Sequence, residues 1–196
     1  AGNLDTSIST AHTALIKVAA VAPHDIVNDP DAAQKWLGNR TGIKSIFSGG
    51  LHLFTAEGEL LAEEPQLPEL PERRGEDFYF SAYFQQTIAT GKPQISNPFT
   101  ASRDGHPTIM MTAPVFDADG RLLFILGGAM DLLAQKNIFH SLTTQKVGQN
   151  GYFYLFAQDR TMIMHPDPTR ILKQDVKPGM NVMFDRALEG FEGSGE

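Results

Sequence analysis

The sequence predicts an α+β domain in which helices flank an antiparallel β-sheet. The clearest evidence for the sheet is a pair of apolar segments, 108–116 and 121–130, rich in Ile, Met, Thr, Val and Leu. Such a composition is typical of buried strands. Between them, Asp117–Gly120 has the Asp and Gly chemistry of a tight turn. The two strands are therefore expected to form a hairpin at the centre of the sheet.

A second observation is a hairpin pattern that occurs twice at a constant offset. Segments 50–65 and 151–166 each contain an apolar strand, a polar turn, a second strand and a closing proline. The differences 151 − 50 and 166 − 65 both equal 101. A solenoid would repeat at a period of about 20 to 50 residues. The offset favours two copies of one larger module, and chance is the alternative because hairpins are common.

Residues 1–22 are predicted to form one helix, which Pro23 ends. Its apolar stripe either packs along the sheet or meets its copy in a homodimer. The stripe consists of residues three and four positions apart, namely Ile8, Ala11, Leu15, Val18 and Ala22. A second helix is expected from Pro30 to about Gly42, because Asp29 is a good N-cap and proline suits the first helical position.

The segment 63–76 is predicted to be a surface loop. It contains three prolines and seven charged residues. Proline lacks the N–H that a central strand must donate to its neighbour, so the segment cannot continue the sheet.

Composition excludes several classes of protein. A net charge of −7 disfavours a nucleic-acid surface, and the absence of cysteine removes disulfides and thiolate chemistry. No apolar run approaches the roughly 20 residues of a membrane span, and no signal peptide is visible. The six histidines form no metal-binding motif, and the serines form no nucleophile elbow. We therefore predict no catalytic residue, no metal and no cofactor.

The order of features from Tyr83 to Leu132 resembles the double Cache family of extracytoplasmic sensor domains. Tyr-Phe opens a helix, Gly-Lys-Pro ends it, and Ile-Ser-x-Pro-Phe follows. A strand then reaches Ala-Pro-Val, Asp-x-Asp-Gly makes the turn, and a Gly-Gly strand ends in Asp-Leu. The resemblance implies PAS-like antiparallel sheets with flanking helices in a tandem arrangement, in which the second module is short or truncated.

The same resemblance implies a division of the chain into four parts. Residues 1–22 would be a signalling and dimer helix, and 23–133 the membrane-distal PAS-like module that binds the ligand. Residues 134–142 would be a helical connector, and 143–196 the membrane-proximal PAS-like module.

Amino-acid-binding members of the family carry Arg-x-Trp-Tyr at the start of the helix. Alignment on the helix start places Ser81 at the arginine, Tyr83 at the tryptophan and Phe84 at the tyrosine. The aromatic shell is thus retained, whereas the arginine that would bind a carboxylate is not.

The family's second motif, Tyr-x-Asp, aligns with Phe99 and Ala101, and its last acid aligns with Ala129. The carboxylates that would bind an ammonium group are therefore also missing, and the ligand is expected not to be an α-amino acid. Asp131 shares a strand face with Ala129 and is either a displaced acidic contact or an ordinary strand-end carboxylate.

Alternation along the strand from Thr108 separates its two faces. Thr108, Met110 and Thr112 share one face, and we expect them to line the cavity. The opposite face is more uniformly apolar and should pack against the helices; it consists of Ile109, Met111, Ala113 and Val115.

The resemblance implies a small-molecule sensor in the periplasmic part of an inner-membrane receptor. The receptor's output would be a diguanylate cyclase, a histidine kinase or a chemoreceptor, and membrane anchoring would lie elsewhere in the full-length protein. A free periplasmic binding protein is the alternative, followed by a hydrolase. The predicted partners are a small ligand, a second copy of the chain, and no nucleic acid.

Overall fold

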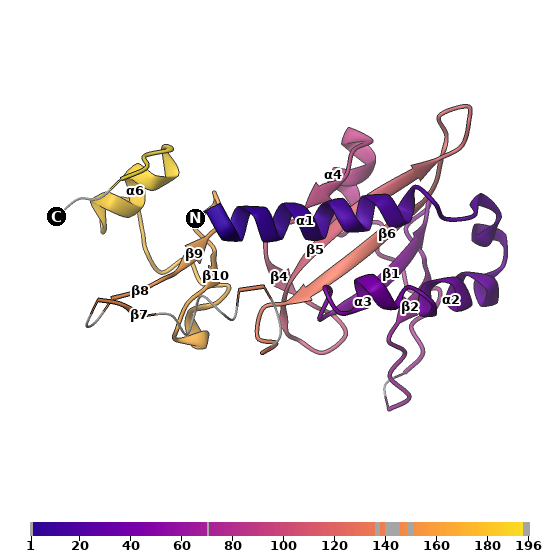
Figure 1. Cartoon of the computed structure of the whole chain (residues 1–196), viewed down its shortest axis with the longest axis horizontal. Helices are drawn as coiled ribbons and strands as arrows, with labels where there is room; N and C mark the ends of the chain where they lie inside the picture. The colour runs from indigo at the N-terminus through magenta and orange to yellow at the C-terminus, as the bar shows by residue number, and fades with distance from the viewer. Residues whose placement is uncertain (1, 70, 136–137, 140–145, 149–150, 194–196) are drawn as a thin grey trace.

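Six strands form one antiparallel sheet in the order β2-β1-β6-β5-β3, with β4 also paired to β5 (Figure 1). The computed structural model describes residues 2–69, 71–135, 138–139, 146–148 and 151–193. The sheet strands are β1 (Gly50–Thr55), β2 (Leu60–Glu64), β3 (Gln94–Ile95), β4 (Phe99–Thr100), β5 (Pro107–Phe116) and β6 (Leu122–Asp131). The α+β class with an N-terminal helix and an antiparallel sheet is confirmed.

The hairpin β5–β6 lies in the middle of this sheet, as the sequence predicts. Its register runs from the pair Thr108 and Asp131 to the last pair beside the turn. One carboxylate oxygen of Asp117 accepts hydrogen bonds from the backbone N–H groups of Asp119 and Arg121, at 3.0 and 2.8 Å. Gly120 has φ of +79°, a conformation that glycine adopts without a steric penalty. Local turn chemistry therefore sets this register.

Helices cover one face of the sheet, and α1 (Gly2–Ala19) lies along this face (Figure 1). The 3₁₀ helix η1 (His24–Asn28), α2 (Pro30–Gly38) and α3 (Thr41–Lys44) follow. The side chain of Asp29 caps α2 by accepting from two backbone N–H groups, at 3.1 and 3.0 Å. The second helix thus starts where predicted, but it ends at Gly38 and not near Gly42, because the chain turns there into α3.

The apolar stripe of α1 faces the chain's own sheet. Ala11 and Leu15 are buried, and α1 contacts β5 and β6. The helix ends at Ala19 and not at residue 22, so Ala22 lies beyond it, although it is buried as well. This packing along the sheet is the first of the two predicted arrangements, and a homodimer through α1 stays a prediction.

The second face of the sheet carries α4 (Ala82–Thr90), which ends at Gly91 with φ of +60°. Met110 packs on this side with Tyr83 and Phe84, whereas Met111 packs on the α1 side. The predicted separation of the two faces of β5 is thus observed. Residues 63–64 end β2, and the described residues 65–69 and 71–76 that follow belong to no helix or strand, but Arg73 among them is buried.

The C-terminal residues occupy one end of the molecule (Figure 1). They form two small sheets, β7 with β8 and β9 with β10, and two short helices. The elements are β7 (Lys146–Val147), β8 (Gly151–Tyr152), β9 (Leu155–Phe156), β10 (Met162–Met164), η2 (Pro168–Arg170) and α6 (Val182–Leu188). The division into two modules stays a prediction.

Part of the predicted connector 134–142 lies outside the described residues, namely 136–137 and 140–142. Among the helices that the structure describes, none combines the length and apolar character needed to span a membrane.

Candidate functional site

A small inner cavity of about 40 Å³ lies on the α4 side of the sheet. Strands β1, β4, β5 and β6 and helix α4 all contribute to its wall, together with the loops before α4 and after β4. The structure brings six of the predicted site residues together around it: Tyr83, Phe99, Ala101, Thr108, Met110 and Ala129. The inner cavity is the candidate ligand site.

A larger outer pocket of about 370 Å³ lies beside the inner cavity and includes Ser81 in its wall. The two spaces share Tyr83 and Phe99, whose ring centroids lie 5.3 Å apart. Burial raises the pKa of the Tyr83 phenol above its usual value, so the group stays neutral at physiological pH. Tyr83 and Phe99 therefore lie in the wall of both spaces, which also share Phe78 and Ser102.

Three predicted site residues line neither space. Phe84 is fully buried and packs edge-on against Phe54, with ring centroids 6.3 Å apart. The hydroxyl of Thr112 lies 2.7 Å from that of Thr87. The carboxylate of Asp131 lies 2.9 Å from a ring nitrogen of His106 at the end of β6.

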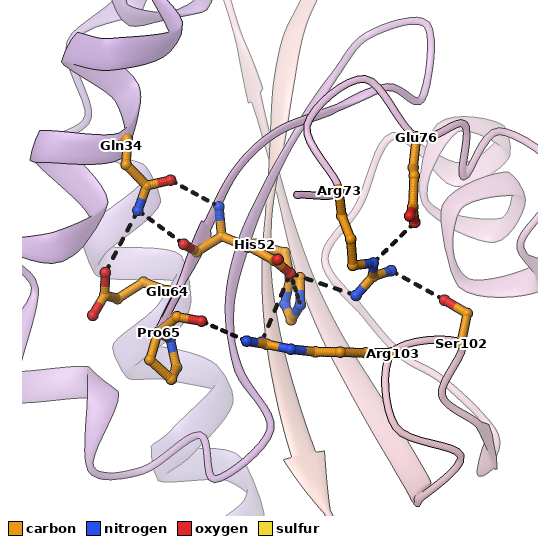
Figure 2. Close-up of polar contacts among 9 residues, drawn as sticks. Gln34, His52, Glu64, Pro65, Arg73, Glu76, Ser102 and Arg103 are labelled. Carbon is orange, nitrogen blue, oxygen red and sulfur yellow. Dashed lines mark hydrogen bonds and ion pairs between the residues drawn. The ribbon is translucent and has the colours of Figure 1, made fainter. Parts of the chain in front are cut away.

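Sequence analysis missed a group of charged and polar residues with largely covered side chains beside the cavity, which we call the charge cluster: His52, Glu63, Arg73 and Arg103. Figure 2 shows the side chains of Arg73 and Arg103 pointing toward the ring of His52 from two different loops. The Glu63 carboxylate lies 3.4 Å from Arg73, 3.7 Å from Arg103 and 3.8 Å from His52. Three of the four, all except Glu63, line the inner cavity.

The backbone of Glu63 is held in place by Gln34 of α2. The Gln34 amide donates to the Glu63 carbonyl at 2.8 Å and accepts from its N–H at 3.2 Å. Helix α2 on one face of the sheet therefore positions a carboxylate of the charge cluster on the other.

Burial lowers the pKa of His52 to about 3, and the positive charges of Arg73 and Arg103 act in the same direction. The imidazole is therefore neutral at physiological pH. A sequence signal for this residue did exist, because His52 is a polar residue within the apolar run Leu51–Phe54. No comparable signal identified Arg73, which sits in a segment with the composition of a solvated loop.

Within the described ranges, no group of three or more His, Cys, Asp or Glu residues is arranged to hold a metal ion. The absence of a metal or cofactor stays a prediction.

Solved structures with a similar fold are ligand-binding domains of chemoreceptors. The domain of the Pseudomonas aeruginosa PAO1 amino acid chemoreceptor PctB in complex with L-Gln has 18% identity and a TM-score of 0.65, and the match covers 88% of this chain and 66% of that one. The PctC domain of the same organism, in complex with GABA, has 22% identity and a TM-score of 0.64, covering 88% and 74%. The Pseudomonas fluorescens CtaA domain in complex with L-isoleucine has 22% identity and a TM-score of 0.66, covering 88% and 66%.

The chain thus spans 66% of the PctB and CtaA chains and 74% of the PctC chain. At these identities the likeness shows a common fold. No curated protein matches the sequence significantly.

The expectation that the ligand is not an α-amino acid is contradicted by these comparisons, because similar domains hold L-Gln and L-isoleucine. It rested on the missing charges at Ser81, Ala101 and Ala129. In the structure, Arg73 and Arg103 bring positive charge to the cavity wall from segments outside these motif positions. Charges needed by a zwitterion need not come from the motif positions.

The resemblance stated from the sequence is confirmed by a family comparison. A family model of the Cache domain matches residues 1–195, nearly the whole chain. The solved structures with a similar fold, which are Cache-type chemoreceptor domains by this comparison, agree with that match. The chain belongs to the Cache domain family.

Proposed function

We propose that the chain is the extracytoplasmic ligand-sensing domain of a bacterial transmembrane receptor, with its ligand bound in the inner cavity. The observation that carries this proposal is the convergence of six predicted site residues, from four segments of the chain, around one cavity. Membership of the Cache domain family and the likeness to chemoreceptor domains support it. Of the possible outputs, a chemoreceptor has the support of these neighbours.

The ligand class we propose is a small amino acid or a related carboxylate. The solved domains of similar fold hold L-Gln, GABA and L-isoleucine, each of which carries an amino group and a carboxylate. The cavity wall of this chain includes both Arg103 and Asp104, so groups of both charges are available to such a ligand.

Binding requires the cavity to enlarge. A volume of about 40 Å³ holds a few water molecules, since one water needs about 10 to 15 Å³, whereas small-molecule sites usually measure about 300 to 1,000 Å³. Phe99 belongs to the two-residue strand β4, which pairs only with β5 among the described strands. We expect β4 to move outward, which would join the inner cavity to the outer pocket of about 370 Å³.

Such a movement could reach the rest of a receptor through the sheet. Strand β5 pairs with β4 on one side and packs against α1 through its other face. A ligand that binds more tightly to one arrangement of β4 and β5 would shift the population of both, and α1 with them.

A thermal-shift screen tests the proposal. The panel contains the proteinogenic amino acids, GABA and simple carboxylates, tested on the parent chain and on Tyr83→Ala and Phe99→Ala. We expect at least one compound to raise the melting temperature of the parent, and both variants to lose that response. Phe80→Ala is the matched control, because this aromatic side chain lies in the same segment but is 85% exposed and lines neither space. No response to the panel, or a response that survives in both variants, would contradict the proposal.

A further inference from the structure

Arg73 of the charge cluster has its hydrogen-bonding capacity largely in use. Its Nε donates to Glu76 at 2.9 Å, and one terminal nitrogen donates to Ser102 at 3.0 Å. The other terminal nitrogen donates to Glu63 at 3.4 Å, and the guanidinium lies 5.2 Å from the centre of the Phe78 ring. Arg73 therefore ties the loop before α4 to its surroundings.

Arg103 and His52 differ from Arg73, because each keeps a buried nitrogen without a partner. The Arg103 side chain is 8% exposed and donates to the Pro65 carbonyl at 2.6 Å. Its Nε and the Nδ1 of His52 have no hydrogen-bond partner among the residues that the structure describes. The Glu63 carboxylate, at 3.7 Å from Arg103 and 3.8 Å from His52, is too far for hydrogen bonds to either.

The charges within the cluster are not balanced. Two guanidinium groups, 9% and 8% exposed, face one carboxylate that is 13% exposed, that of Glu63. The second partner of Arg73 is Glu76, whose side chain is 47% exposed and hydrated. His52 is neutral. The buried part of the cluster therefore carries about one positive charge in excess, at the wall of a cavity.

We propose that Arg103 and His52 form an anion-binding subsite in the inner cavity, which takes the carboxylate of the ligand. This inference rests on the proposed function and names the group that the ligand must carry. One carboxylate oxygen accepts from the Nε–H of Arg103, and the other from an N–H at Nδ1 of His52. A neutral imidazole can carry its proton at Nδ1, and hydrogen bonds from a guanidinium to a carboxylate are charge-assisted.

A single carboxylate fits the charge of the site better than a phosphate dianion does. One negative charge balances the excess of the cluster, whereas a second would face Glu63 and the nearby carboxylate of Asp104, which also lines the cavity.

The family motif has an arginine at the position of Ser81. In the proposed subsite the positive charge comes instead from Arg103, in a different part of the chain. Arg103 lies in the loop between β4 and β5, while His52 lies in the middle of β1. A carboxylate held by both joins this loop to the central sheet. Since the same loop leads from Phe99, ligand binding would fix the position of β4.

Acetate is the probe for this subsite, because it is the smallest carboxylate with a methyl group and does not depend on knowing the ligand. The measurement is the ¹H–¹⁵N signal of the His52 imidazole, assigned by its disappearance in His52→Gln. We expect a saturable shift with sodium acetate at constant ionic strength, and none with acetamide, which has the same shape but no charge. Sodium phosphate at the same pH should give a shift at least tenfold weaker in apparent affinity.

Variants separate charge at the site from net charge. Arg103→Gln should weaken the acetate response at least tenfold, and Arg103→Lys should keep part of it. Arg74→Gln is the matched control: it removes the same charge from a residue of the segment between β2 and α4 that pairs with Asp31 at 3.0 Å and does not line the inner cavity. It should leave the response unchanged. If Arg103→Gln does not fold, the comparison of acetate with acetamide in the parent chain decides alone.

The subsite is overturned if acetamide shifts the His52 signal as acetate does, or if Arg103→Gln folds and responds like the parent. A ligand from the thermal-shift panel that needs Phe99 but tolerates Arg103→Gln and amidation of its carboxylate would overturn the subsite and leave the sensor proposal in place. A specific acetate response with no panel response would contradict the sensor proposal alone.

Discussion

The hydroxyl oxygens of Thr87 and Thr112 lie 2.7 Å apart and join helix α4 to the middle of strand β5. Both residues are fully buried, and Thr87 also donates to the carbonyl of Tyr83 at 2.7 Å. Thr112 therefore does not line the inner cavity; it holds α4, and with it Tyr83, against the sheet. The position of the Tyr83 ring in the cavity wall therefore depends on the buried contact between Thr87 and Thr112.

Thr112→Val should lower the free energy of unfolding by about 1 to 3 kcal/mol, because the methyl group that replaces the hydroxyl leaves buried polar groups without a partner. Urea denaturation measures this. Thr90→Val is the control, because Thr90 lies at the exposed end of the same helix, and it should cost less than about 0.5 kcal/mol. Equal losses of unfolding free energy in the two variants would show that the buried Thr87–Thr112 contact adds no more stability than an exposed threonine does.

Phe99→Ala should reduce ligand binding at a small cost in stability. Phe99 is half-buried on an edge strand, whereas Phe84 is fully buried in the core between sheet and α4. Phe84→Ala should therefore cost about 3 to 5 kcal/mol, and Phe99→Ala clearly less. Urea denaturation of the two variants, with calorimetric binding of a compound from the panel, checks both statements. A loss of several kcal/mol in Phe99→Ala would identify Phe99 as a core residue and not as a wall of the site.

Leu15→Glu should unfold the domain or destabilise it by several kcal/mol, because it buries an unpaired carboxylate between α1 and the sheet. Lys17→Glu, on the exposed face of the same helix, is the control and should change stability by less than about 0.5 kcal/mol. Circular dichroism in urea measures both. A Leu15→Glu chain that stays folded and changes only its sedimentation behaviour would contradict this expectation and support the dimer interpretation of the stripe.

His52 should make the domain sensitive to acid. Its pKa is about 3 in the folded chain and about 6.5 when exposed, so the folded state favours the neutral ring. The stability that this neutral ring contributes is fully present above pH 6.5 and is lost as the pH falls toward 3, by up to about 1.4 kcal/mol per pH unit. Urea titrations between pH 7 and pH 4 should therefore show a steeper loss in the parent chain than in His52→Gln. Parallel curves would show that His52 is not buried as a neutral group.

His106 should change the stability of the domain with pH in the opposite direction to His52. Its hydrogen bond to Asp131 raises its pKa above the ordinary value, so the folded state favours the charged ring. The stability that the charged His106 ring contributes is present below pH 6.5, and it is lost as the pH rises through the pKa of His106 in the folded state. His106→Gln should therefore reduce the difference in stability between pH 6 and pH 8, a range in which His52→Gln has little effect. NMR titration of the two rings gives the same comparison directly.

Much of the architecture is determined by local sequence. Asp29 and Pro30 start α2, and Asp117–Gly120 make the central turn, because capping and turn geometry depend on residues only a few positions apart. The alternation along β5 likewise separates the face toward α1 from the face toward α4. Whether the repeated hairpin pattern marks two modules stays a prediction.

Only the tertiary structure decides which residues of other elements pack against each position on the face of a strand. Thr108 and Thr112 share a face, yet Thr108 borders the cavity while Thr112 meets Thr87 of α4. Alternation cannot distinguish them, because the difference depends on where the helix axis crosses the strand.

The charge cluster shows the same limit in the site itself. Arg73 and Arg103 lie in loops that are 30 positions apart in sequence, and each by itself has the pattern of a solvated surface segment. They meet at Glu63 because those loops fold over β1 and the end of β2. Desolvation and pairing of these charges come from contacts between distant segments, and no local pattern encodes such contacts. The sequence by itself therefore determined the central hairpin, the helix cap and the turn, and the fold decided which charges line the cavity.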